Sequence, residues 1–168
     1  MTQTTPQPEP QLALSTSLSS KLRKVLLTWF ACGRVPFAPG TIGSLGALPF
    51  GWIFLAIGGP LLLLGAAAAL FVAGWLCADA ELPGDDSDPG WIVVDEVVGM
   101  WIALAAAPVS ILWHGAAFVL FRLFDILKPW PVSWADRNVG GGLGVMLDDV
   151  LAGLYAALII IIARAVLV

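Results

Sequence analysis

Five carboxylates stand at the ends of segments that are otherwise apolar: Asp95 and Glu96, Asp125, and Asp148 and Asp149. Ionisable groups at membrane depth cost at least about 2.5 kcal/mol each, so they generally face a polar cavity and have a function there. Clustered acids repel one another, and a divalent cation removes that repulsion. Because carboxylate oxygens favour Mg²⁺ over Zn²⁺, we expect Asp95, Glu96, Asp148 and Asp149 to bind magnesium. The plain alternative is that the acids pair with nearby bases and only hold helices together.

A glycine-rich segment, FAPGTIGS at residues 37–44, directly precedes an apolar helix. Its glycines expose backbone N–H groups, the helix start adds positive potential, and Thr41 and Ser44 add hydroxyls. This combination is typical of an anion site, although ordinary turn and capping chemistry explains the same residues equally well. A second glycine-rich loop at residues 138–142 has the same two interpretations.

Several bases lie near the acids in the sequence. Arg122 is three residues before Asp125 on one helical face, and Lys128, Arg137 and Arg34 follow or precede apolar segments. A site that holds both carboxylates and bases suits a phosphate ester bridged by a cation. For Arg34, anchoring to a lipid headgroup is an equally good interpretation.

The remaining reactive residues exclude several mechanisms. His114 is the only histidine, and it lies about 16 Å along its helix from Asp125. Histidine phosphatase chemistry and nucleophiles activated by histidine are therefore disfavoured. Cys32 and Cys77 have no metal-binding or redox spacing.

The composition determines the class of protein. Of 168 residues, 59% are hydrophobic and 12% are charged, and the mean hydropathy is +0.91. An ordinary soluble domain carries about 25% charged residues, so lipid must cover much of this surface. The net charge of −4 argues against a nucleic-acid partner.

We therefore expect an all-α, polytopic membrane protein with a disordered tail at residues 1–20 and one membrane-embedded domain at residues 21–168. Glycine, proline and polar breaks predict five apolar helices, at about residues 44–57, 61–80, 91–107, 109–127 and 145–168. An amphipathic helix beginning at Lys21 should lie on the membrane surface. Gly99, Ala152 and Gly153 should permit close helix approach one turn beyond the acids.

The direction of each helix predicts at which end of the bundle the charged residues lie. Consecutive spanning helices alternate in direction, so every polar loop and all five acids fall at one end of the bundle, and an excess of Lys and Arg there predicts the cytoplasmic side. The helix at 44–57 is short, about 21 Å. If it is re-entrant, the Thr41 segment and the acids would separate onto opposite faces.

Three blocks of the sequence resemble a known family: FAPGTIGSLGALPF, DPGWIVVDEVVGMWIAL and FRLFDILKPWPVSWADRNVGGGLGVMLDDVLAG. They are similar to the signature blocks of phosphatidylglycerophosphatase A, a bacterial membrane phosphatase that converts phosphatidylglycerophosphate to phosphatidylglycerol. The resemblance covers about residues 33–153 and implies Mg²⁺ dependence, an inner-membrane location and a cytoplasmic active site. Some family members are expected to carry histidine at the position of Gly140, so that histidine is not expected to be essential. The motif positions in this chain are Thr41, Ser44, Asp88, Asp95, Glu96, Arg122, Asp125, Lys128, Pro129, Asp136, Arg137, Asn138, Asp148 and Asp149.

The combined expectation is a lipid phosphatase whose substrate is phosphatidylglycerophosphate within the membrane lipid. The expected catalytic residues are Asp95, Glu96, Asp125 and Asp149, and the expected phosphate-binding residues are Thr41, Ser44, Arg122, Lys128 and Arg137. Attack by metal-activated water and an aspartyl-phosphate intermediate both remain open. The rival functions are a small ion transporter or channel subunit, in which the carboxylates form a permeation site, and a non-catalytic membrane scaffold.

Overall fold

The computed structural model describes residues 10–82 and 89–167, and side chains from residue 18 onward within them. These residues form helices and contain no strand, which confirms the all-α prediction. The elements are α1 (Pro10–Leu27), the 3₁₀ helix η1 (Cys32–Arg34), α2 (Pro39–Glu81), α3 (Val94–Ala106), α4 (Ile111–Leu127), α5 (Val132–Asn138) and α6 (Gly141–Leu167).

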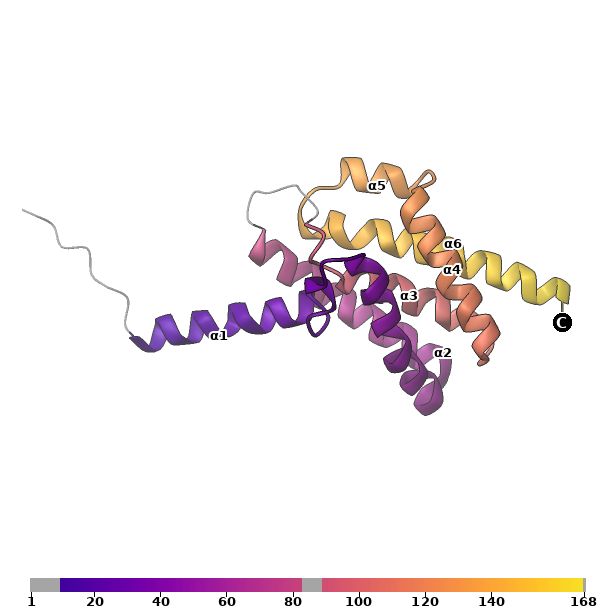
Figure 1. Ribbon diagram of the computed structural model, residues 1–168, viewed down its shortest axis with the longest axis horizontal. Helices are drawn as coiled ribbons and strands as arrows, with labels where there is room; N and C mark the ends of the chain where they lie inside the picture. Colours follow the sequence, from indigo (N-terminus) through magenta and orange to yellow (C-terminus); the bar gives the residue numbers. More distant parts are fainter. Residues whose placement is uncertain (1–9, 83–88, 168) are drawn as a thin grey trace, which may run out of the picture.

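Helix α2 doubles back on itself, as Figure 1 shows. The reversal is at Gly59, whose φ of 69° and ψ of −165° are not helical. Glycine tolerates this positive φ, and Pro60 follows it without an N–H to continue the ladder. We call residues 39–58 the first arm of α2 and residues 60–81 the second arm. The turn predicted at residues 58–60 is confirmed.

Helix α3 is the centre of the bundle. Nine of its 13 residues are buried, and it packs against α2, α4 and α6. Trp101 secures it to the first arm, because its Nε1 donates a hydrogen bond of 2.9 Å to the carbonyl of Ala47. Ala107 and Pro108 then end the helix.

Helices α3 and α6 run in the same direction in backbone contact. Asp95 lies beside Asp149 near one end of the pair, and Arg164 Nη1 donates to the carbonyl of Ala106 at the other. Between these points, a Cβ added to Gly153 would overlap the carbonyl of Gly99. The predicted close approach of α3 and α6 is therefore confirmed, and it is what brings the acids of the two helices together.

Two helices in the described residues, α2 and α6, are long and apolar enough to cross a membrane. That is fewer than the five apolar helices predicted. The difference has two physical sources. First, the helices predicted at residues 44–57 and 61–80 are the two arms of α2, so they count as one helix. Second, α3 and α4 have only 13 and 17 residues, or about 20 and 26 Å, and are too short to be counted.

Several predicted boundaries are wrong. Helix α1 begins at Pro10, inside the tail predicted to be disordered, whose residues 1–9 lie outside the described part. Figure 1 shows α1 projecting from the bundle, so its place on a membrane surface stays a prediction. Helix α2 begins at Pro39, five residues before the predicted start, because proline suits the first turn of a helix. Helix α5 forms where a loop was expected.

The contact of Gly99 with Gly153 gives a test of stability. We expect Gly153→Ala to lower the free energy of unfolding by about 1–3 kcal/mol, because the new methyl group has no space against the backbone of α3. Denaturant titration in detergent, followed by circular dichroism, measures this. Gly115→Ala in α4 is the matched control, since a Cβ there meets no atom within 4 Å. Equal stability of the two variants would contradict the packing.

Candidate active site

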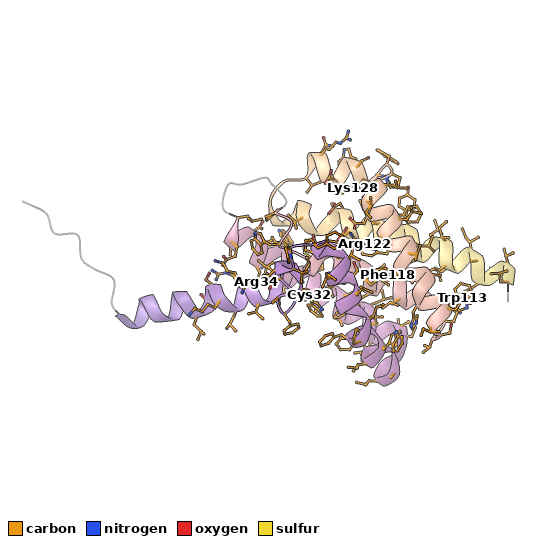
Figure 2. The ribbon with its side chains drawn as sticks, viewed as in Figure 1. Cys32, Arg34, Trp113, Phe118, Arg122 and Lys128 are labelled. Carbon is orange, nitrogen blue, oxygen red and sulfur yellow. The ribbon has the colours of Figure 1, made fainter. Side chains whose placement is uncertain are left out.

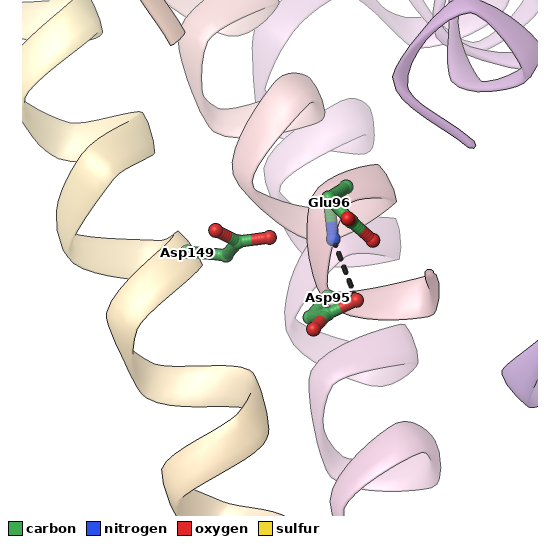
Figure 3. A group of neighbouring side chains, drawn as sticks. All are labelled: Asp95, Glu96 and Asp149. Atoms are coloured by element: carbon green, nitrogen blue, oxygen red, sulfur yellow. Dashed lines mark hydrogen bonds between the residues drawn. The ribbon is translucent and has the colours of Figure 1, made fainter. Parts of the chain in front are cut away.

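Three carboxylates converge between α3 and α6. Asp95, Glu96 and Asp149 each offer an oxygen within 4.8 Å of the other two, and Figure 3 shows Asp149 facing the start of α3. Asp95 and Asp149 are 5% and 3% exposed. An Asp95 side-chain oxygen also accepts a 3.0 Å hydrogen bond from the Glu96 backbone N–H. We call these three residues the carboxylate trio.

The first turn of α2 and the last turns of α4 border Glu96. A Cβ added to Gly40 would overlap Glu96 Oε1 and would lie 3.1 Å from Arg122 Nη1. That guanidinium is 2.6 Å from Asp125 Oδ2 and 3.8 Å from Glu96 Oε1. The start of the first arm and the acids are therefore at the same end of the bundle, as the alternation of helices predicts, and are not separated as a re-entrant helix would require.

Asp148 faces a different partner. Lys128 Nζ donates to Asp148 Oδ2 at 2.8 Å and to Asp136 Oδ1. Partial burial alone lowers the pKa of the Lys128 ammonium, but these two carboxylates outweigh it and raise that pKa above its ordinary value. Lys128 therefore stays positively charged throughout the physiological range and neutralises Asp148, which lies outside the trio.

The other predicted phosphate ligands differ in how far they are exposed. Thr41 is half-buried in the first turn of α2. Ser44 is fully buried, and its hydroxyl donates to the carbonyl of Gly40 at 2.8 Å. It therefore does not provide the capping that was the alternative interpretation of this segment. Arg137 is exposed on α5. Asp88 lies outside the described residues.

Asp79 was missed by the sequence reasoning. Its Oδ1 accepts a 2.6 Å hydrogen bond from the backbone N–H of Gly142, in the first turn of α6. A Cβ on Gly142 would lie 2.6 Å from the carbonyl of Trp75 and 2.7 Å from the Asp79 nitrogen. Glycine thus lets α6 start against the second arm, and Asp79 caps it from 63 residues away. The run of three glycines was the available signal, but the distant partner was not readable.

His114 lies at the end of the bundle opposite to the carboxylate trio. It is 3% exposed and lies 5.7 Å from the ring of Trp52, measured between centroids. Figure 2 shows its neighbour Trp113 at the end of α4 away from Arg122 and Lys128. The structure therefore keeps the only histidine apart from the carboxylates, as its spacing predicts.

The trio suits a divalent cation. It combines three hard oxygen donors within 4.8 Å, and Glu96 Oε2 is buried with no hydrogen-bond partner among the described residues. A buried carboxylate oxygen without a partner is costly, and a cation would satisfy it. Beside the trio, Arg122 Nε is also buried without a partner, and no side chain caps the start of α2. Cation and anion ligands thus adjoin, which is the arrangement that phosphoryl transfer requires.

Comparisons with known proteins agree with this chemistry. The family model described as phosphatidylglycerophosphatase A matches residues 25–164. Phosphatidylglycerophosphatase A of Escherichia coli is 41% identical over 79% of this chain and 78% of its own length, and that of Haemophilus influenzae is 43% identical over 81% and 85%. A Bacteroides thetaiotaomicron protein provisionally named a phosphatidylinositol-3-phosphatase is 46% identical over 83% and 92%. No solved structure matches the chain.

The cap on α6 can be tested separately. We expect Asp79→Leu to lower the free energy of unfolding by about 1–2 kcal/mol, because the N–H of Gly142 loses its acceptor. Asp79→Asn keeps an oxygen acceptor and should retain most of the stability. Thermal unfolding in detergent compares the two variants. If asparagine is as damaging as leucine, the hydrogen bond is not what holds the start of α6.

Proposed function

This chain belongs to the phosphatidylglycerophosphatase A family, and from that premise we propose that it hydrolyses the terminal phosphomonoester of phosphatidylglycerophosphate. The products are phosphatidylglycerol and inorganic phosphate, and the reaction takes place at the cytoplasmic face of a bacterial inner membrane. The observation that supports this most directly is the carboxylate trio beside Arg122 and the uncapped start of α2.

We further propose that the trio holds Mg²⁺. Bound there, the ion would supply charge to the phosphoryl oxygens and acidify a water molecule. The remaining groups belong to the chain itself. Arg122 and the first-turn amides of α2 bind and orient the phosphate, while Lys128 holds Asp148 and Asp136 between α4, α5 and α6. Arg137 and Thr41 border the same end and complete the phosphate contacts.

The substrate's charged headgroup explains why these groups lie at the end of an apolar bundle. Large side chains such as Leu61, Ile111 and Val166 are more than three-quarters exposed and suit contact with lipid tails. The acyl chains of the substrate can therefore stay in the bilayer while the headgroup alone enters the polar site.

The name of the Bacteroides relative raises a second substrate, the 3-phosphate of phosphatidylinositol. Both lipids present a phosphomonoester near a phosphodiester, so the trio suits either. We propose phosphatidylglycerophosphate as the preferred substrate, because two relatives and the family model carry that name. The ratio of kcat/KM for the two lipids decides between them.

The catalytic proposal predicts the effect of removing single charges. Asp95→Asn and Asp149→Asn should each lower phosphate release from phosphatidylglycerophosphate at least about 100-fold, because each weakens cation binding and transition-state stabilisation. EDTA should abolish release by the unaltered protein, and Mg²⁺ should restore it. Glu81→Gln, an acid at the same end that pairs with Arg23 instead, serves as the control and should change release less than about threefold.

These measurements also separate the rival functions. A channel subunit or a scaffold releases no phosphate from either lipid, with or without Mg²⁺. Undiminished release by both asparagine variants would place catalysis outside the trio.

Orientation makes a further prediction. In a variant without Cys32 and Cys77, a cysteine introduced at the exposed Lys21 should react with a membrane-impermeant maleimide only from the cytoplasmic side. One introduced at Val166, which is 78% exposed near the other end of α6, should react only from the periplasmic side. The reverse pattern would place the trio at the periplasmic face.

A further inference from the structure

A cavity whose lining includes two basic side chains lies apart from the carboxylate trio. It has a volume of about 310 Å³ and is lined by Lys24, Thr28, Arg34 and Trp91. Figure 2 shows Arg34 at the junction of α1 with the bundle, away from Arg122 and Lys128. Its described lining contains no carboxylate, so its chemistry differs from that of the trio.

The chain turns sharply to build this cavity. Trp29, Phe30 and Ala31 all have positive φ, at 42°, 54° and 75°, a left-handed conformation that is unfavourable for residues with a Cβ. Immediately afterwards, a Cβ on Gly33 would overlap the carbonyl of Trp91. The turn therefore seats η1 tightly against the segment before α3 and holds Arg34 across from α1.

On the α1 side of the cavity, the hydroxyl of Thr28 already has hydrogen-bond partners in the backbone. Thr28 is 3% exposed, and its hydroxyl donates to the carbonyl of Lys24 at 2.7 Å while accepting from the Ala31 N–H at 3.2 Å. These bonds stabilise the wall of the cavity. The groups left to contact a ligand are the guanidinium of Arg34 and the ammonium of Lys24, which has only a loose ion pair at 3.6 Å with Glu81.

The described charges around the cavity do not balance. Glu81 is paired with Arg23 at 2.8 Å and, more loosely, with Lys24 at 3.6 Å. Arg34 has no ion pair with any described residue. Among the described residues, Arg23, Lys24 and Arg34 thus have one carboxylate, Glu81, in ion-pair contact with this group, and Arg34 is left without a counter-charge from that part of the chain.

We propose that this cavity binds the phosphate group of an anionic phospholipid, separately from the substrate phosphate at the trio. Its volume lies within the range of small-ligand sites. Arginine and lysine are the usual partners of phosphate, and Trp91 is of the type that packs at the headgroup level. Such a lipid would tie α1 and η1 to Trp91, four residues before Asp95.

The test uses the full chain in neutral detergent with EDTA, so that the trio holds no cation that could attract phosphate. Thermal unfolding is followed with added phosphatidylserine, phosphatidylcholine or inorganic phosphate. We expect phosphatidylserine, and neither of the others, to raise the Tm by a few degrees. Arg34→Gln and Lys24→Gln should remove the shift, and Arg34→Lys should keep most of it.

Lys21→Gln is the matched control, because it removes the same charge from an exposed position of α1 that does not line the cavity. It should keep the full shift. The proposal is overturned if all variants respond equally, if phosphatidylserine gives no shift, or if inorganic phosphate alone reproduces it. A lower Tm of Arg34→Gln in phosphatidylcholine with an unchanged phosphatidylserine response would instead assign Arg34 to an internal ion pair. None of these outcomes depends on phosphatase activity.

Discussion

The site depends on one contact, the backbone approach of α3 and α6 at Gly99 and Gly153. Each helix places acids within about one turn of that contact, and the two helices run in the same direction. Side chains larger than hydrogen at these positions would push the helices apart and carry Asp95 away from Asp149. The acids are therefore held together by packing energy, which must exceed the repulsion between like charges.

That repulsion organises the surrounding charges. Arg122 lies against Asp125 and Glu96, and Lys128 lies between Asp136 and Asp148. Counting Asp95 and Asp149, six carboxylates meet two cations in these contacts. Bases neutralise the outer acids, and the excess negative charge is concentrated where the trio lies. A divalent cation is the simplest group that stabilises this arrangement, and it would also attract a phosphate.

The sequence allowed the direction of the helices to be predicted better than their boundaries. The direction of each helix follows from the number of chain reversals before it, and the sequence marks the reversal at Gly59 and Pro60 clearly. The prediction that the Thr41 segment lies at the same end as Glu96 was therefore correct. Local signals were weaker. Ser44 has the residue type of a cap but lies one turn inside α2, because Pro39 starts the helix earlier. Helix α5 and the cap from Asp79 depend on tertiary contacts with α6, which no local pattern contains.

The half of the bundle away from the trio argues against a permeation path. Among the described residues it contains two ionisable side chains: Arg164, and His114, whose two ring nitrogens have no hydrogen-bond partner. Arg164 donates to the last turn of α3, and His114 is buried against Trp52. The cavity of about 320 Å³ between α2, α3 and α6 is lined only by apolar residues, including Ala67, Val98 and Val150. An ion that reached the trio would find no polar groups with which to continue. Carboxylates that stop at one depth suit a reaction on a headgroup, whereas conduction would require polar groups through the whole bilayer.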